Sequence, residues 1–166
     1  MAVHLYPRAH HTWWEAELGG HELLAQPGAF GSNLAVDGVT EHDVLLGDRF
    51  RLGTALLEVS QPRLPCWKIE HRFGRKGMVA TIIKTARCGW YFRVVEEGLA
   101  RAGDLLERTE TGRTAWTVAE VFSEIANPKA PATPERLQAM ADCELLSPSW
   151  RAGAGMRLEA TASGSR

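Results

Sequence analysis

The chain has 166 residues, of which 45% are hydrophobic, enough to bury one core in a single domain with at most a small appendage. Its formal net charge of −1 gives no overall attraction to nucleic acid or anionic membranes, and no apolar run approaches the roughly 20 residues that span a bilayer. Three scattered cysteines without a C-x-x-C pair and an N-terminus unlike a signal peptide predict a cytoplasmic protein.

The N-terminal region begins with an alternating run at 2–6, which predicts a strand already under way at the start of the chain. A domain rarely starts inside a core strand, so we expect upstream sequence to belong with this one. Thr12–Glu15 fits a capping box for a short helix, which the following glycine pair ends. The neighbouring His10 and His11 are expected at the surface.

A hairpin is the clearest supersecondary signal. A glycine-shaped loop at 28–34 is followed by two strand-like runs, 47–52 and 55–60. Gly53 and Thr54 between these runs predict a type II′ turn. The remaining predicted elements are a short strand at 34–36, a helix at 78–86, a strand at 90–95, a strand start at 103–107 and three short helices beginning at Thr117, Thr133 and Ser147.

The composition divides the chain into three parts. Residues 1–114 are rich in strand signals and predict a mostly β domain. Residues 115–158 carry the three helices and predict a short C-terminal helical domain. Residues 159–166 are small and polar and predict a disordered tail.

The segment Pro62–Lys68 carries the strongest chemical signal. Two prolines bracket a bend that presents Cys66 with Arg63 and Lys68 on either side. A thiol is a nucleophile or metal ligand only as the thiolate, which nearby cations favour. The alternative is a buried cysteine packed beside Trp67, because free cysteines are often buried.

A local excess of positive charge surrounds this cysteine. Residues 61–93 contain eight basic residues and one acid, Glu70, which predicts either a solvated basic face or a pocket for an anionic small molecule. His71 is a candidate base toward Cys66, whereas Cys88 and Cys143 are expected to be packing residues.

Pro62–Lys68, together with Arg87–Val94, resembles the molybdenum cofactor sulfurase C-terminal (MOSC) domain family. Residues 28–38 are similar to that family's glycine-Asn-Leu loop, and 47–50 to its next strand start. The nearest resemblance is to the bacterial branch with a C-terminal three-helix domain, of the 6-N-hydroxylaminopurine resistance type. The resemblance implies a MOSC-type β-barrel-like domain with a short α-helical appendage, in which an N-terminal part of the family domain is missing.

The resemblance also implies a site. Cys66 would be the catalytic residue and the thiolate ligand of molybdenum in a pterin-bound molybdenum cofactor. The residues expected to bind the cofactor and its phosphate are Asn33, Arg63, Lys68, Arg87 and Arg93. Pyridoxal phosphate is not expected, because the desulfurase domain of larger sulfurases is absent from this sequence. One departure is Ser32, which stands where the family loop usually carries Glu.

The implied activity is a two-electron reduction of N-hydroxylated nucleobases or related compounds to an amine and water. A separate redox protein would donate the electrons, since the sequence has no flavin or iron–sulfur motif; nucleic acid and membrane partners are not expected. Two alternatives stay open: a sulfur carrier with a Cys66 persulfide, and a non-catalytic module that binds a small anion.

Overall fold

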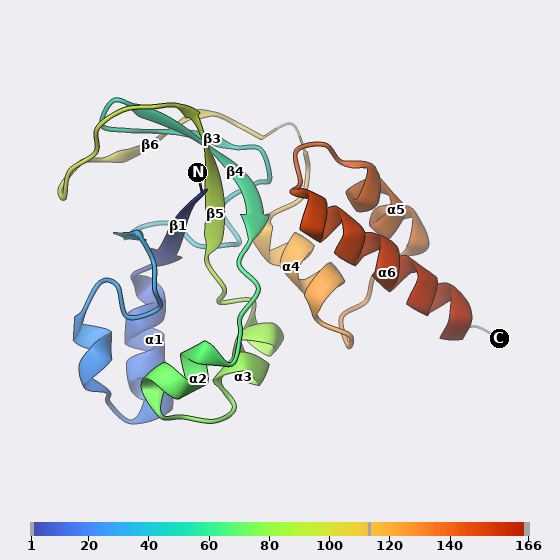
Figure 1. The fold of residues 1–166 in the computed structure, drawn as a ribbon, viewed down its shortest axis with the longest axis horizontal. Coiled ribbons are helices and arrows are strands. Elements are labelled where there is room, and N and C mark those ends of the chain that lie inside the picture. Colours follow the sequence, from blue (N-terminus) through green and yellow to red (C-terminus); the bar gives the residue numbers. More distant parts are fainter. Residues whose placement is uncertain (1, 113, 165–166) are drawn as a thin grey trace.

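The computed structural model describes residues 2–112 and 114–164. Strands and helices alternate irregularly in the first two thirds of this range, and three helices follow (Figure 1). The elements are β1 (Ala2–Pro7), α1 (Ala9–Leu18), the 3₁₀ helix η1 (Glu22–Ala25), β2 (Leu34–Val36), β3 (Arg49–Leu52), β4 (Ala55–Pro62), α2 (Lys68–Phe73), α3 (Met78–Thr85), β5 (Trp90–Glu96), β6 (Leu106–Glu110), α4 (Val118–Ala126), α5 (Pro134–Asp142) and α6 (Pro148–Gly164).

The six strands form one curled sheet in the order β2-β1-β5-β4-β3-β6. All neighbours are antiparallel except β1 and β2, and the two edges β2 and β6 leave the sheet as a half-barrel. The β3–β4 hairpin closes at Leu52 and Ala55, and Gly53 has a φ of 57°. A type II′ turn needs a positive φ at its first central residue and a negative φ at its second, and Thr54, the second, is not among the residues of positive φ. The fold class, a MOSC-type β-barrel-like domain with a C-terminal helical appendage, is confirmed.

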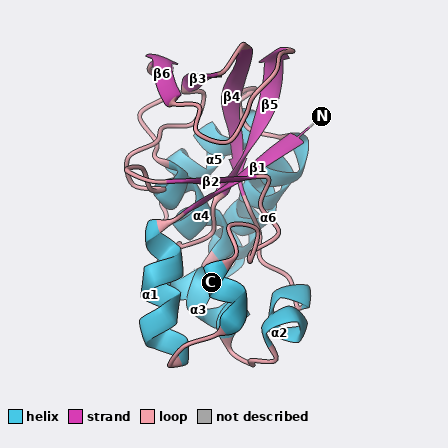
Figure 2. Cartoon of the chain, turned by 90° about the vertical axis from the view of Figure 1, so that its left-hand side faces the viewer, coloured by secondary structure: helices cyan, strands magenta, loops and turns pink. Residues whose placement is uncertain are grey.

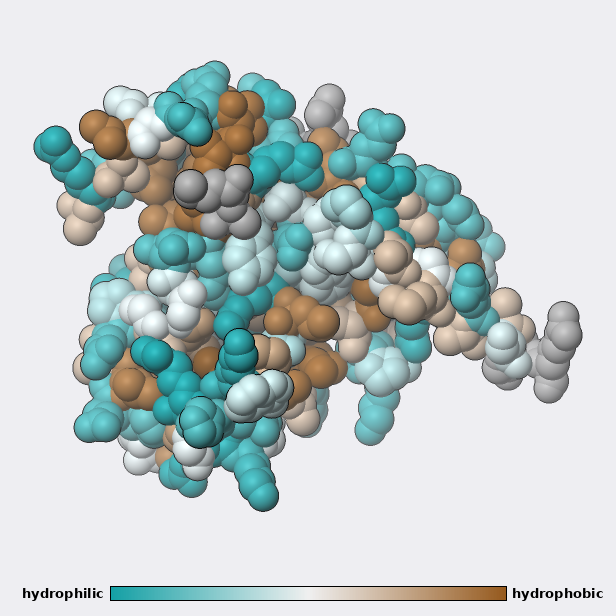
Figure 3. Space-filling model, viewed as in Figure 1, coloured by the Kyte–Doolittle hydropathy of each residue, from teal (hydrophilic) through white to brown (hydrophobic). Residues whose placement is uncertain are grey.

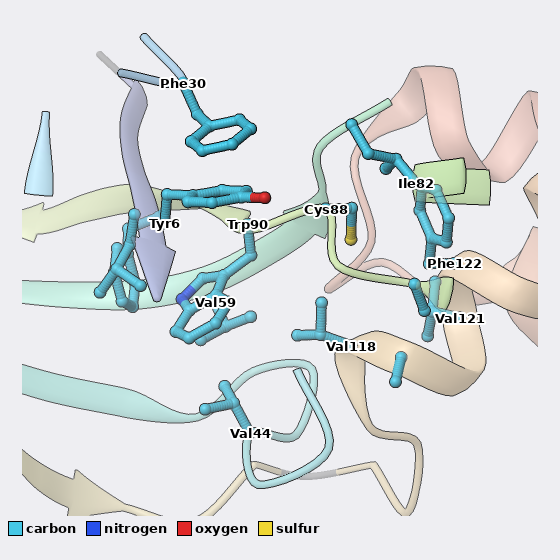
Figure 4. Close-up of a cluster of buried hydrophobic side chains, with 14 of the residues drawn as sticks. Tyr6, Phe30, Val44, Val59, Ile82, Cys88, Trp90, Val118, Val121 and Phe122 are labelled. Carbon is cyan, nitrogen blue, oxygen red and sulfur yellow. The ribbon is translucent and has the colours of Figure 1, made fainter. Parts of the chain in front are cut away.

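The core lies under the middle of the sheet and extends into the helices. Trp90 and Phe92 of β5 are fully buried and belong to the same apolar cluster as Val118 and Phe122 of α4. Figure 4 shows Cys88 between Trp90 on one side and Val118 and Phe122 of α4 on the other. Because α4 shares the core of the sheet, it holds the C-terminal helices against the β region.

The helices form two groups, one beyond the end of the sheet and one beside it. Figure 1 and Figure 2 show α1, α2 and α3 together beyond the ends of β1 and β4, while α4, α5 and α6 lie beside the sheet. Thr117 caps α4 through the predicted capping box, in which its hydroxyl accepts from the Glu120 N–H and the Glu120 carboxylate accepts from the Thr117 N–H. The division at residue 114 stays a prediction.

Three local predictions differ from the structure. α1 begins at Ala9, one turn before the expected capping box, although it ends at Gly19 as expected. The six-residue helix α2 was not predicted. α6 continues to Gly164, so residues 159–164 are helical where a disordered tail was expected, and 165–166 lie outside the described residues.

The surface of the described residues is mixed. No described helix combines the length and apolarity needed to cross a bilayer. Exposed apolar side chains at the free end of the sheet include Val95, Leu99 and Leu105, and Figure 3 shows apolar surface over this end.

Candidate functional site

Cys66 is exposed at the junction between the sheet and the first helical group. It lies four residues after the end of β4 and two before α2 begins, in a segment that crosses from sheet to helix (Figure 1). Leu64 and Trp67 beside it are 60% and 67% exposed. The alternative reading, a buried cysteine packed beside Trp67, is therefore wrong.

Backbone bonds hold this segment against the loop before β5. Pro62 pairs with Trp90 at the end of the β4–β5 ladder, and the Arg63 N–H donates to the Gly89 carbonyl at 3.0 Å. Gly89 has a φ of 69°, and a Cβ there would lie 2.4 Å from the Leu5 carbonyl oxygen. Only glycine fits this close approach. Through the bond from Arg63 to Gly89, the loop supports the segment that presents the thiol.

The predicted cations divide into two kinds. Arg63 and Lys68 stand three residues before and two residues after Cys66, and neither makes a side-chain hydrogen bond or ion pair with the part of the chain that the structure describes. Arg87 stacks over the Trp13 ring at 4.3 Å, and its Nε is buried without a hydrogen-bond partner among the described residues. Arg93 is engaged: it bonds the Leu145 carbonyl and pairs with the buried Glu58 at 3.5 Å.

Asn33 ties the glycine loop to β1. Its Oδ1 accepts from the His4 N–H at 2.8 Å, and its own N–H donates to the His4 carbonyl at 2.8 Å. Ser32, the departure from the family pattern, donates its hydroxyl to the Pro27 carbonyl at 3.3 Å. The structure thus gives Asn33 a positioning role, and its predicted contact with a cofactor stays a prediction.

His4 is a buried polar residue that the sequence analysis missed. Burial, then the positive charge of Arg63, lowers its pKa to about 4, so the ring is neutral near pH 7. Nδ1 donates to the Gly31 carbonyl at 3.3 Å, which leaves Nε2 as a buried acceptor with no hydrogen-bond partner among the described residues. The ring packs against Tyr91 at 5.0 Å. The sequence signal that could have indicated a buried His4 is its position inside the apolar strand β1, where it is the one residue whose ordinary pKa lies near neutral pH.

Cys88 has the structural role that the sequence predicts. It is 1% exposed, and burial, followed by the charge of Glu41, raises the pKa of its thiol well above the usual range. Burial likewise raises the pKa of Tyr6. His71, the candidate base, is exposed and meets the Trp67 ring edge-on at 6.0 Å. Among the described residues, no hydrogen bond joins His71 to the Cys66 thiol, and its role stays a prediction.

A groove of about 620 Å³ opens beside the Cys66 segment. Its walls come from the sheet end and Leu64 on one side and from α4 and α6 on the other. The lining is mostly apolar, and includes Tyr91 and Trp150. A groove of this size accommodates a small organic molecule.

The described residues contain no cluster of three or more His, Cys, Asp or Glu side chains that could hold a bare metal ion. A metal that brings a pterin with its own ligands needs only one protein thiolate, and Cys66 is exposed and free to take that role. The unpaired Arg63 and Lys68 suit the negative charge of a phosphate. The residues present therefore fit the cofactor that the resemblance implies.

Sequence comparisons relate the chain to three curated proteins. YflK of Bacillus subtilis, named as uncharacterized, is 46% identical over 117 residues, which are 67% of this chain and 50% of YflK. YiiM of Escherichia coli is 40% identical over 102 residues, 61% of this chain and 46% of YiiM. A protein of Gibberella moniliformis named as a reductase is 37% identical over 121 residues, 72% of this chain and 22% of that protein. The chain thus spans half or less of the length of each.

Solved structures share the fold. YiiM from Geobacillus stearothermophilus has a TM-score of 0.85 at 34% identity, covering 94% of this chain and 77% of that one. YiiM from Escherichia coli has a TM-score of 0.85 at 32% identity, covering 96% of this chain and 78% of that one. The sequence model of the MOSC domain matches residues 1–107, well over half of the sequence. The chain therefore belongs to the MOSC domain family.

Proposed function

We propose that this protein binds the molybdenum cofactor through Cys66 and reduces N-hydroxylated nucleobases or related N-oxygenated compounds. The MOSC family is associated with the molybdenum cofactor, and one relative carries the name reductase. The observation that carries the proposal is the exposed Cys66 thiol on a segment that also carries Arg63 and Lys68, two cations without an ion pair among the described residues.

Each residue has a defined task in this proposal. Cys66 would hold the metal as thiolate, while Arg63 and Lys68 would bind the phosphate of the cofactor. His4, packed against Tyr91, is neutral near pH 7 because its pKa is lowered to about 4, so it adds no positive charge to that of Arg63. The bound cofactor would supply the two-electron chemistry, which converts R–NHOH, two electrons and two protons into R–NH₂ and water.

We assign the substrate to the groove, because Leu64 of the Cys66 segment lines it. Its aromatic side chains Tyr91 and Trp150 suit a flat heterocycle, and Leu64 connects it to the thiol segment. A separate redox protein would deliver the electrons. The exposed Trp67, with Lys68 next to it, offers an apolar and cationic contact beside the site for such a donor.

Reduction of 6-N-hydroxylaminopurine by cofactor-loaded protein, with a chemical reductant as donor, tests the proposal. We expect adenine to form, and Cys66→Ala to lower the rate at least 100-fold. Cys143→Ala removes a partly exposed thiol in the helical appendage and is expected to leave the rate within twofold. No adenine from fully loaded protein would contradict the reductase proposal.

The exposed thiol also favours a second candidate, a sulfur carrier. Incubation with a cysteine desulfurase and cysteine, followed by mass spectrometry, would then show one extra sulfur on Cys66. Absence of that sulfur argues against a carrier. Absence of adenine, of persulfide and of molybdenum together would leave anion binding as the function.

A further inference from the structure

Glu41 is a buried carboxylate that the proposed reaction does not use. It is 1% exposed and lies in the loop between β2 and β3. A buried carboxylate costs several kcal/mol unless hydrogen bonds compensate it. Oε2 lies 2.6 Å from Nε2 of the buried His10, and Oε1 accepts from the Gly89 N–H at 2.6 Å. His10 was expected at the surface, and that expectation is wrong.

The bond to Gly89 connects Glu41 with the functional thiol. Gly89 donates its N–H to Glu41, and the Gly89 carbonyl accepts from the Arg63 N–H. Arg63 lies three residues before Cys66. Two consecutive hydrogen bonds therefore join the buried carboxylate to the segment that presents the thiol.

The loop 86–89 needs such an anchor. It begins with Ala86 in the left-handed region, at a φ of 54°, which costs a non-glycine residue about 1 kcal/mol or more. It also contains the buried Cys88 thiol. Among the described residues, the other side-chain hydrogen bond to this loop comes from the Tyr6 hydroxyl, which donates to the Arg87 carbonyl at 3.2 Å. The carboxylate of Glu41 supplies the shorter of the two.

The main chain of Glu41 reaches the opposite wall of the groove. Its carbonyl accepts from the Ala119 N–H at 3.0 Å, in the first turn of α4. The C-terminal end of α4 contributes Ile125 and Ala126 to the groove. Glu41 thus connects α1, the loop 86–89 and α4 at one point.

We propose that Glu41, held by His10, is a positioning residue that fixes the loop 86–89 and, through Arg63, holds the segment that presents Cys66. The importance of Cys66 rests on the proposed function, whereas the positioning is a property of the chain without cofactor. An experiment on the cofactor-free protein can therefore refute the positioning role without refuting cofactor binding, and the reverse also holds.

Alkylation of the cysteines in the cofactor-free protein tests the proposal. Native protein is treated with iodoacetamide, and the rate at each cysteine is read by mass spectrometry. In the wild type, Cys66 should react and buried Cys88 should be protected. Glu41→Ala is expected to speed labelling of Cys88 at least tenfold and to change the Cys66 rate at least threefold, because the loop loses its anchor.

Two further variants separate positioning from general stability. Glu41→Gln keeps an oxygen for the Gly89 N–H and an amide for His10, so both rates should stay within twofold of wild type. Glu41→Asp is one methylene shorter and should speed Cys88 labelling about threefold, which keeps the test available if the alanine variant does not fold.

Glu124→Ala is the matched control, since Glu124 is also buried and bonds Arg136 twice, within the helical appendage. At equal folded fraction, it should change neither rate. Wild-type Cys88 protection in both Glu41→Ala and Glu41→Asp would overturn the proposal. Equal exposure of Cys88 in Glu124→Ala would also overturn it, because the effect would then be global.

Discussion

Protonation of His4 should destabilise the fold as the pH falls, before the carboxylates of the protein are fully protonated. The folded pKa of His4 is about 4, against 6.5 for an ordinary histidine, because the ring is buried and lies near Arg63. The folded state therefore binds fewer protons than the unfolded state between these values. The free energy of unfolding is highest above pH 6.5 and falls as the pH drops toward 4.

The size of this effect follows from the shift. One pKa unit corresponds to about 1.36 kcal/mol, so the loss contributed by His4 between pH 6.5 and 4 is up to about 3 kcal/mol. His4→Gln removes the titrating ring, and its stability should fall less over the same range. Arg63→Gln removes the second cause and should raise the pKa of His4 toward 6.5.

Urea unfolding at pH 7 and pH 4.5, with NMR titration of the His4 ring, measures both quantities. The wild type should lose at least about 1 kcal/mol more than His4→Gln between these pH values. A His4 pKa near 6.5, or parallel losses in the two proteins, would refute the reasoning about burial.

Three substitutions test other parts of the structure by urea unfolding. Gly89→Ala should cost more than about 2 kcal/mol, because its Cβ would meet the Leu5 carbonyl and the φ is positive; a cost below about 0.5 kcal/mol would contradict this geometry. Thr117→Ala should cost about 1 kcal/mol through loss of the capping box with Glu120, and no loss would show that the cap is not formed. Trp67→Ala should change stability by no more than about 0.5 kcal/mol, because the ring is 67% exposed; a loss of about 3 kcal/mol would indicate a buried ring.

Local sequence signals predicted the elements whose determinants are local. The Gly53-Thr54 turn and the strand at 90–95 appear where expected because turn chemistry and alternation act within a few residues. The capping box at Thr117 is equally local. α2 was missed because its six residues are too few to show helical periodicity.

The site was harder to predict because its contacts join distant residues. His10 is buried by Glu41, 31 positions away, and nothing near His10 in the sequence indicates that partner. Arg93 was counted with the basic block, but its bonds to Glu58 and Leu145 depend on strand pairing and on the helical appendage. Cys66, directly after the bend between Pro62 and Pro65, was the part of the site that the sequence could indicate.

Molybdenum analysis of protein purified from a host that makes the cofactor tests the central claim most directly. The proposal predicts about one molybdenum per chain in the wild type and in Cys143→Ala, and at least a tenfold loss in Cys66→Ala. Molybdenum content that is unchanged in Cys66→Ala, or absent from the wild type, would contradict the assignment of Cys66 as the metal ligand.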